Sequence, residues 1–275
     1  MAKRFLAAAI GVPLIFAVVF LGYYLPVLFD IAVAIICAVS VAEFAGAVGS
    51  LRLLQLSIPS LLFAAAYPIL LTFGYGMVSC FVYSGIMLSM IVFFHKKITY
   101  KELSYTYSMT MIITVALSTI VMIKNMYPDY APFYFLIALG LPWMADIGAF
   151  FAGTFFGRHK LCPEISPKKT VEGAVGGVLF CIGATCFISW LLSFIGYGAA
   201  ARIDYLHVVS MAFIGSFLSI IGDLSFSMIK RNFGIKDYGS ILPGHGGFLD
   251  RFDSVIFVSP FMLLFVTYFP IIFKA

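Results

Sequence analysis

Charged side chains are scarce in this sequence. Of its 275 residues only 11% are Asp, Glu, Lys or Arg, whereas 63% are hydrophobic. No long stretch of the chain lacks an apolar run, so no soluble domain is predicted. Runs of about twenty apolar residues recur along the whole length, and each can cross a hydrocarbon core about 30 Å thick. The chain is therefore predicted to be an all-α, polytopic membrane protein.

The sequence also lacks the cysteine spacing of a metal site and a clear leader peptide. Its five cysteines include no C-x-x-C pair, and most lie in apolar runs, so we interpret them as small apolar residues. Lys3 and Arg4 precede the first apolar run, but no A-x-A cleavage pattern follows it. That run is therefore predicted to be the first membrane helix.

Nine membrane spans are predicted from the apolar runs. They lie near residues 5–23, 26–48, 56–74, 76–95, 106–124, 132–157, 173–195, 206–230 and 253–273. Neither an internal repeat nor a linker separates them, so residues 1–275 are predicted to form a single integral membrane domain.

Basic residues are distributed unevenly between the two ends of these spans. Fourteen of the seventeen Lys and Arg residues fall on the side of the N-terminus, and only Lys124, Arg202 and Lys274 fall on the other. Cytoplasmic loops carry such an excess, so the N-terminus is predicted to be cytoplasmic and the C-terminus outside. Without the two loops that are candidates for ligand binding, six basic residues remain against three, and the sign of the bias survives.

Residues 227–253 concentrate the scarce charge in one polar, Gly-rich stretch, SMIKRNFGIKDYGSILPGHGGFLDRFD. Within it, the segment 243–247 lets the backbone approach a ligand closely, and its amides can form an anion nest. The flanking cations Lys230, Arg231, Lys236 and Arg251 favour phosphate as the ligand. His245 is a base, a phosphate donor or a turn residue, and we favour contact with phosphate.

Four acidic residues fall inside predicted spans, where a charge is costly: Asp30, Glu43, Asp146 and Asp223. Asp30 and Glu43 lie near opposite ends of the second span, and either can reach an interface or pair with a neighbouring helix. A structural role is the preferred interpretation for both, and a functional role is the alternative.

Asp223 belongs with the polar stretch that follows it. Ser227 lies one turn later on the same helical face, and Asp250 and Asp253 would share a face if the last span is helical from its start. Three carboxylates close together repel one another, and a divalent cation such as Mg²⁺ would relieve this. The alternative is a set of salt bridges with the loop cations.

A second polar loop spans residues 158–172. Ser166–Pro167 predicts a turn, and Thr170 is a plausible N-cap for the next span. Lys168 and Lys169 would then lie near a helix N-terminus, which favours anions. The alternative is a loop that is basic only because of the membrane topology.

Glycines recur at the spacing of closely packed membrane helices. Gly153 and Gly157 form G-x-x-x-G, and Gly173, Gly176 and Gly177 open the next span. We interpret them as packing positions because small residues let helices approach closely.

The pattern Ser227-x-Ile-Lys-Arg-x4-Lys-Asp-x-Gly-x2-Leu-Pro-x-His-Gly-Gly-Phe-x-Asp-Arg-Phe-Asp resembles the signature of phosphatidate cytidylyltransferases, also called CDP-diacylglycerol synthases. A second block is similar to another recurring region of that family. It comprises Trp143–Asp146, Gly153, Phe156–Gly157, Ser166-Pro-x-Lys169-Thr and Glu172–Gly177. The resemblance is strong over about residues 143–253, and no motif position departs from the pattern.

The resemblance implies conversion of CTP and phosphatidic acid to CDP-diacylglycerol and pyrophosphate in the lipid bilayer, with Mg²⁺, a plausible second cation and a homodimer. No nucleic-acid partner is expected. It implies catalytic spans and loops in 132–275, after N-terminal spans in 1–131. It also implies Asp223, Asp250 and Asp253 as catalytic cation ligands, with Asp146 as a further one. The implied substrate-binding residues are Ser166, Lys168, Lys169, Ser227, Lys230, Arg231, Lys236, His245 and Arg251. A bacterial inner membrane, with the site on its cytoplasmic face, is the expected location.

Two other functions compete with this one. An ion- or proton-coupled transporter would explain Asp146 and Asp223 as a relay, but not the Gly-rich basic stretch. A CDP-alcohol phosphotransferase would show the pattern D-x2-D-G-x2-A-R, which this sequence lacks.

Overall fold

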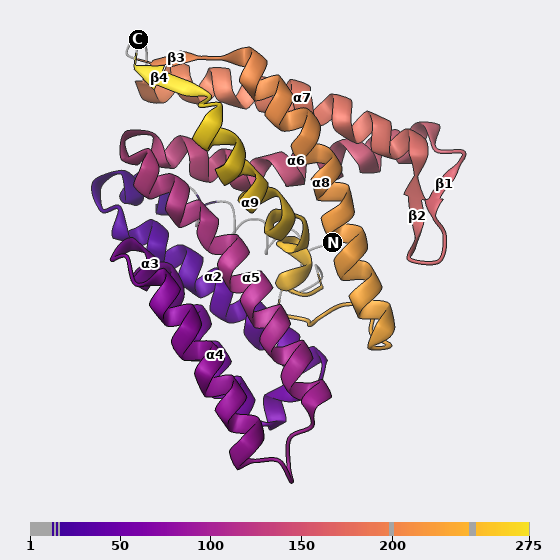
Figure 1. Ribbon diagram of the computed structural model, residues 1–275. Coiled ribbons are helices and arrows are strands. Elements are labelled where there is room, and N and C mark those ends of the chain that lie inside the picture. The colour runs from indigo at the N-terminus through magenta and orange to yellow at the C-terminus, as the bar shows by residue number, and fades with distance from the viewer. Residues whose placement is uncertain (1–12, 14, 16, 198–200, 242–245, 275) are drawn as a thin grey trace. The chain divides into compact units, whose positions relative to one another are not determined.

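The computed structural model describes residues 13, 15, 17–197, 201–241 and 246–274. They form two compact units (Figure 1): unit 1 contains the chain up to Met126 together with Phe233–Phe252, and unit 2 contains Tyr127–Asn232 and the chain from Asp253 onward. Seven helices among these described residues are long and apolar enough to cross a membrane, which confirms an all-α polytopic membrane protein. The predicted first span, 5–23, lies mostly outside the described residues, so the number nine stays a prediction.

The described part of unit 1 contains four long helices from residue 27 onward, with short connections. Its elements are α2 (Val27–Ala47), η1 (Ser50–Arg52), α3 (Leu54–Thr72), α4 (Gly76–Phe93), α5 (Tyr100–Met126) and η5 (Leu249–Arg251). The predicted spans 26–48, 56–74 and 76–95 match α2, α3 and α4 within two residues at each end, whereas α5 is longer than the predicted 106–124 at its start. Its first turn is polar, because Glu102 accepts hydrogen bonds from the backbone and hydroxyl of Thr99 at 2.8 and 2.7 Å.

Aromatic side chains and paired hydroxyls join α3, α4 and α5. The rings of Phe63 and Tyr83 stack with centroids 4.3 Å apart, and Tyr83 stacks on Tyr107 at 5.6 Å. The buried Tyr83 hydroxyl lies 2.9 Å from Ser60 Oγ. A buried hydroxyl requires such a partner, so these polar groups fix the register of the helices in an otherwise apolar core.

Asp30 has the structural role that was preferred for it. Lys124 Nζ of α5 donates to Asp30 Oδ1 at 2.5 Å, and Thr72 Oγ1 of α3 donates to Asp30 Oδ2 at 3.1 Å. Asp30 and Lys124 are both buried. The pair therefore neutralises two charges inside unit 1 and ties three helices together.

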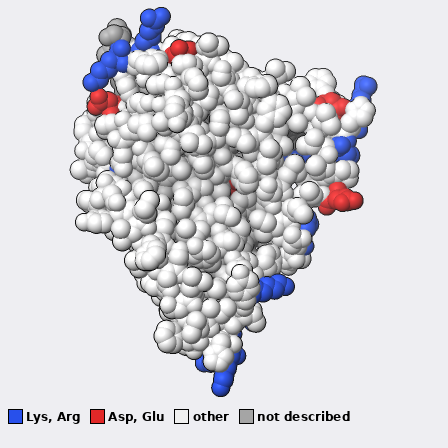
Figure 2. Space-filling view, viewed as in Figure 1, with Lys and Arg blue, Asp and Glu red and all other residues white. Residues whose placement is uncertain are grey.

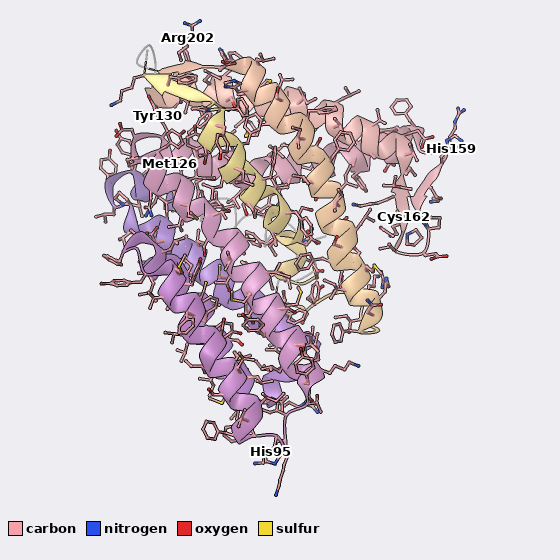
Figure 3. All side chains as sticks on the ribbon, in the orientation of Figure 1. His95, Met126, Tyr130, His159, Cys162 and Arg202 are labelled. Carbon is pink, nitrogen blue, oxygen red and sulfur yellow. The ribbon has the colours of Figure 1, made fainter. Side chains whose placement is uncertain are left out.

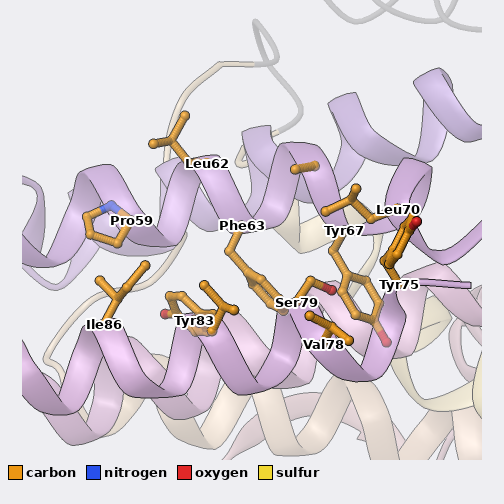
Figure 4. Close-up of a pocket in the computed structure, with 12 residues that line it drawn as sticks. Pro59, Leu62, Phe63, Tyr67, Leu70, Tyr75, Val78, Ser79, Tyr83 and Ile86 are labelled. Atoms are coloured by element: carbon orange, nitrogen blue, oxygen red, sulfur yellow. The ribbon is translucent and has the colours of Figure 1, made fainter. Parts of the chain in front are cut away.

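A groove of about 460 Å³ runs between α3 and α4 (Figure 4). Phe63, Tyr67 and Tyr83 line it together with Pro59 and Leu70, and no charged residue is among its described lining residues. The α4 helix is the least buried of the seven long helices of the described chain. An apolar groove beside such a helix suits hydrocarbon rather than a charged ligand.

The described part of unit 2 combines four further long helices with the β1–β2 hairpin and a separate two-stranded pairing of β3 with β4. Its elements are η2 (Pro128–Tyr130), α6 (Ala131–Phe156), β1 (Lys160–Cys162), β2 (Ser166–Thr170), α7 (Val171–Leu192), η3 (Ser193–Tyr197), β3 (Ala201–Ile203), α8 (Tyr205–Asn232), α9 (Asp253–Tyr268) and β4 (Ile272–Lys274). In Figure 1 the β1–β2 hairpin projects beyond the ends of α6 and α7.

Glycines bring α6 and α7 into backbone contact, as the glycine spacing predicts. A Cβ on Gly177 would lie 2.8 Å from the carbonyl oxygen of Ala145, and one on Gly173 would lie 2.8 Å from that of Ala149. A Cβ on Gly148 would lie 3.1 Å from the Cα of Gly177. Larger side chains cannot fit at this interface, so the glycines are packing residues.

The last predicted span, 253–273, is helical only to Tyr268. Pro270 follows, and β4 then pairs antiparallel with β3, with Ala201 opposite Lys274 and Ile203 opposite Ile272. Proline cannot donate a backbone hydrogen bond, so it ends the helix early. Lys274 Nζ lies 3.1 Å from Asp129 Oδ2, and this charge and hydrogen bond raise the pKa of Lys274.

Candidate functional site

A cavity of about 370 Å³ lies within unit 2, between α6, α7, α8 and the β1–β2 hairpin. It differs from the groove of unit 1 because charged residues line it. These are Asp146, Lys168, Lys169 and Asp223. Figure 2 shows how sparse charge is elsewhere, since most of the visible surface carries neither blue nor red atoms. A polar cavity in so apolar a chain is the leading candidate site.

The hairpin brings the lysines to this cavity. β1 and β2 pair antiparallel, with Lys160 opposite Thr170 and Cys162 opposite Ser166. The predicted turn at Ser166–Pro167 is wrong, because these residues begin β2 and the turn lies at residues 163–165. Pro167 is tolerated there because a two-stranded hairpin leaves one edge of each strand unpaired.

Glu172 fastens the base of the hairpin to the first turn of α7. Its carboxylate accepts a hydrogen bond from the backbone N–H of Arg158 at 3.0 Å. It also accepts one from the backbone N–H of His159 at 3.2 Å and lies 2.6 Å from His159 Nδ1. Figure 3 labels His159 and Cys162 on this hairpin. The sequence motif included Glu172, but its anchoring role was not predicted.

Thr170 caps α7 as predicted. Its Oγ1 accepts the backbone N–H of Gly173 at 3.1 Å. Lys168 and Lys169 therefore immediately precede a capped helix N-terminus, whose partial positive charge adds to theirs. Lys168 is exposed, whereas Lys169 is half-buried and forms an ion pair with Asp223 Oδ2.

Asp223 and Asp253 form the acidic part of the site in unit 2. Asp253 begins α9 and is only 5% exposed, so burial dominates its environment, and the charges of Asp223, Lys230 and Asp146 also act on it. Gly222 permits this arrangement, because a Cβ there would lie 3.2 Å from the carbonyl oxygen of Asp253. The helix α8 can thus approach the first turn of α9 closely.

Neighbouring hydroxyls and cations surround these two carboxylates. Ser254 N donates to Asp253 Oδ1 at 2.6 Å, and Ser254 Oγ donates to the carbonyl oxygen of Ser219 at 3.2 Å. Ser227 Oγ lies 3.5 Å from Asp223 Oδ1, and Lys230 is buried. The cations Lys169 and Lys230 therefore balance charge that would otherwise be uncompensated.

The donor set fits a hard divalent cation. Among the described residues no three His, Cys, Asp or Glu side chains form a ready metal cage. Asp223 and Asp253 nevertheless supply carboxylate oxygens at the charged end of α8 and α9, with Asp146 exposed on α6. Mg²⁺ suits such a site, because it binds through one or two carboxylates and takes its other ligands from water and substrate phosphates.

The remaining predicted site residues of unit 2 lie close in sequence to these groups. Ser166 is half-buried at the start of β2, and Arg231 is exposed in the last turn of α8. In unit 1, Lys236 and Arg251 are exposed. His245 lies outside the described residues.

Asp250 belongs to unit 1, where its carboxylate accepts hydrogen bonds from backbone N–H groups. Its Oδ2 accepts the N–H of Tyr238 at 3.1 Å and that of Gly247 at 3.0 Å. Asp250 lies in the 3-10 helix η5 (Leu249–Arg251), and α9 begins at Asp253. That Asp250 and Asp253 share a helical face stays a prediction.

Comparison with known proteins places these residues in a family. The profile described as "Cytidylyltransferase family" matches residues 2–269. The phosphatidate cytidylyltransferase of Bacillus subtilis (strain 168) is 34% identical over 184 residues, covering 67% of this chain and 65% of that protein. Those of Staphylococcus saprophyticus and Staphylococcus aureus (strain COL) are 43% and 44% identical over 129 residues, covering 47% of each chain.

The matched segment of this chain thus spans between about half and two thirds of the length of these curated relatives. A transporter function gains no support from any of them. Because the family profile covers nearly the whole sequence, this integral membrane protein belongs to the cytidylyltransferase family.

Proposed function

We propose that this chain is a phosphatidate cytidylyltransferase, which forms CDP-diacylglycerol and pyrophosphate from CTP and phosphatidic acid. The observation that carries the proposal is the cavity of unit 2, where Lys168 and Lys169 precede the capped N-terminus of α7 and Asp223 pairs with Lys169. Lysines that can bind anions and a carboxylate that can bind a cation lie together there, as a reaction between two phosphate compounds requires.

In the proposed reaction, a phosphate oxygen of phosphatidic acid attacks the α-phosphorus of CTP. A new phosphorus–oxygen bond forms while the bond from the α-phosphorus to the bridging oxygen of the β-phosphate breaks, and pyrophosphate leaves in line. The attacking phosphate is already ionised at neutral pH, so no residue need act as a general base.

The chain's own contribution is to hold and screen the two anionic reactants. Lys168, Lys169 and Lys230 would contact their phosphates, aided by the dipole of α7. Asp223 and Asp253 would hold Mg²⁺, which when bound neutralises phosphate charge and orients the leaving group. Asp146, which also lines the cavity, is proposed as a further cation ligand, together with a second cation.

Residues outside unit 2 enter the proposal through the family signature. Asp250 is proposed as a further catalytic cation ligand, and Lys236, His245 and Arg251 as phosphate contacts. In unit 2, Arg231 is proposed as another phosphate contact. Ser166 and Ser227 are proposed as hydroxyl donors to a substrate phosphate.

The membrane location, the sidedness of the termini and the oligomeric state are also proposals. The excess of basic residues supports a cytoplasmic N-terminus and site, with the C-terminus outside, and the bacterial relatives support the inner membrane. A homodimer follows from the resemblance alone. Mass measurement of the protein in lipid nanodiscs would test it, and a monomeric mass with full activity would exclude it.

The function is tested with purified protein, phosphatidic acid and radiolabelled CTP. We expect a CDP-lipid product that requires both substrates and a divalent cation, and that disappears when the cation is chelated. The matched control is Asp253→Asn, which keeps the side chain's shape but removes its charge. Absence of product with every divalent cation tried, from protein that remains folded, would overturn the proposal.

A further inference from the structure

Glu43 is a buried carboxylate that no step of the proposed reaction uses. It lies near the end of α2 and is only 5% exposed. Its Oε2 accepts the backbone N–H of Leu249 at 2.6 Å, whereas its Oε1 makes no hydrogen bond to any described residue. Burying a carboxylate is costly, so its position inside unit 1 calls for an explanation.

The described part of the Gly-rich stretch closes around this carboxylate. A Cβ on Gly239 would overlap Glu43 Oε1, and one on Gly247 would lie 2.9 Å from Oε2. Gly247 also donates its N–H to Asp250 Oδ2 at 3.0 Å. The backbone therefore passes directly between the carboxylates of Glu43 and Asp250, and only glycine leaves enough space for it.

Aromatic rings beside Glu43 support the same segment. Phe44 packs edge-on against Phe233, with ring centroids 6.3 Å apart, and lies 6.0 Å from Tyr238. Tyr105 of α5 contacts Phe233 at 5.4 Å. Tyr238 in turn donates its N–H to Asp250. The segment around Asp250 is thus held at both ends by residues of α2 and α5.

We propose that Glu43 is a positioning residue for Asp250. By accepting the N–H of Leu249 and packing against Gly239 and Gly247, it fixes the turn that presents the Asp250 carboxylate. This inference rests on the proposed function only in giving Asp250 a catalytic task. The anchoring itself is a property of unit 1.

The anchoring is tested by hydrogen exchange on the full-length protein in lipid nanodiscs. Glu43→Ala removes the acceptor, so we expect exchange over residues 246–252 to rise at least tenfold, which reports a loss of local protection. The matched control is Asp30→Asn, which alters the other buried acid of α2 and should leave this segment protected. Unchanged exchange in folded Glu43→Ala would overturn the proposal.

The functional part is tested by kinetics on the same variants. Substituting a residue that orients a metal ligand typically lowers metal affinity or activity about 10–100-fold. We therefore expect Glu43→Ala to lower kcat and to raise the Mg²⁺ concentration for half-maximal activity about tenfold, with little change in the KM for CTP. An unchanged Mg²⁺ requirement would overturn the positioning role. An inactive wild type would instead overturn the proposed function and leave the exchange result valid.

Two further variants keep the test decisive if Glu43→Ala does not fold. Glu43→Gln retains an oxygen acceptor for the Leu249 N–H and should restore most of the protection and activity. Gly239→Ala leaves Glu43 in place but crowds its Oε1, so it should reproduce the defect. Its control is Gly46→Ala, where a Cβ meets no atom within 4 Å. Equal behaviour of the two alanine variants would contradict the proposal.

Discussion

The negative charges of the carboxylates are stabilised by different partners in the two units. In unit 1, Glu43 and Asp250 accept hydrogen bonds from the backbone amides of Leu249, Tyr238 and Gly247. In unit 2, Asp223 pairs with the side chain of Lys169, and Asp253 is influenced by Lys230. Backbone amides cannot leave without unfolding a turn, whereas a lysine side chain can rotate to another partner.

The carboxylates of unit 1 therefore have fixed partners, whereas the Asp223 carboxylate of unit 2 has a partner that can be exchanged. The amide bonds of unit 1 set the shape of the Gly-rich stretch. The ion pair in unit 2 holds Lys169 beside the cavity, and in the proposed reaction a substrate phosphate would replace the Asp223 carboxylate as its partner. The comparison therefore predicts that variants of unit 1 change kcat, and that variants of the unit 2 lysines change KM.

The largest effect is expected at Asp250. Asp250→Ala should lower kcat more than about a hundredfold, while the protein remains folded in detergent. Asp250→Asn can still accept the N–H groups of Tyr238 and Gly247, so it should keep the local hydrogen-exchange protection that Asp250→Ala loses. Retained turnover in a folded Asp250→Ala variant would remove this residue from the catalytic groups.

Lys169 should show the next largest effect. Lys169→Ala removes both the partner of Asp223 and a phosphate contact, so the KM for one anionic substrate should rise about tenfold. Steady-state kinetics with CTP and phosphatidic acid varied separately would measure this. Lys168→Ala should raise a KM less, because Lys168 is exposed and has no recorded ion pair with a described residue. Unchanged KM values for both variants would favour a purely topological role for these lysines.

Glu172 tests how far the lysines depend on the hairpin. Glu172→Ala frees the backbone N–H groups of Arg158 and His159, which loosens the hairpin that carries Lys169. The KM that rises in Lys169→Ala should therefore also rise in Glu172→Ala, by about two- to fivefold. Limited proteolysis should show earlier cleavage within residues 158–170. His159→Ala, which removes only the side-chain contact, is the control and should have a smaller effect. Equal KM values for wild type and Glu172→Ala would contradict this anchoring.

The smallest effect on turnover is expected at Asp30. Asp30→Asn leaves Lys124 buried without its counter-ion and should lower the free energy of unfolding by about 3 kcal/mol, with kcat/KM unchanged in the folded protein. Thermal unfolding in detergent would measure the loss. Replacing both partners, as in Asp30→Leu with Lys124→Met, should recover much of it. A fall in kcat/KM at constant stability would contradict a purely structural role.

Much of the helical fold could be predicted from the sequence because hydrocarbon thickness dictates the length of each apolar run. The cap at Thr170 could also be predicted, because capping depends on local residues alone. The β1–β2 hairpin was missed because strands of three and five residues in a charged segment show no apolar alternation. The start of the last span at residue 253 matches α9, whereas its end was missed, because β4 pairs with the distant strand β3 and no local pattern shows this pairing.

The candidate site was predicted less completely than the fold. The motifs contain Asp253 and Lys169, and Asp223 stood out as an acidic residue inside an apolar span. Their pairing depends on how α8 approaches the hairpin and α9. Glu43 gave one signal only, a carboxylate inside an apolar span. Its partner Leu249 lies 206 positions later in the chain, and no local pattern connects the two.

The backbone contact between α6 and α7 has a consequence for genetic screens. Replacing Gly173, Gly176 or Gly177 by alanine would push apart the helices that carry the hairpin and Asp146. A screen that scores only growth would rank these glycines beside the proposed cation-binding carboxylates, although none of them has a side chain to offer a substrate. Scoring the amount of membrane-inserted protein in parallel would separate the residues that build the cavity from those that work in it.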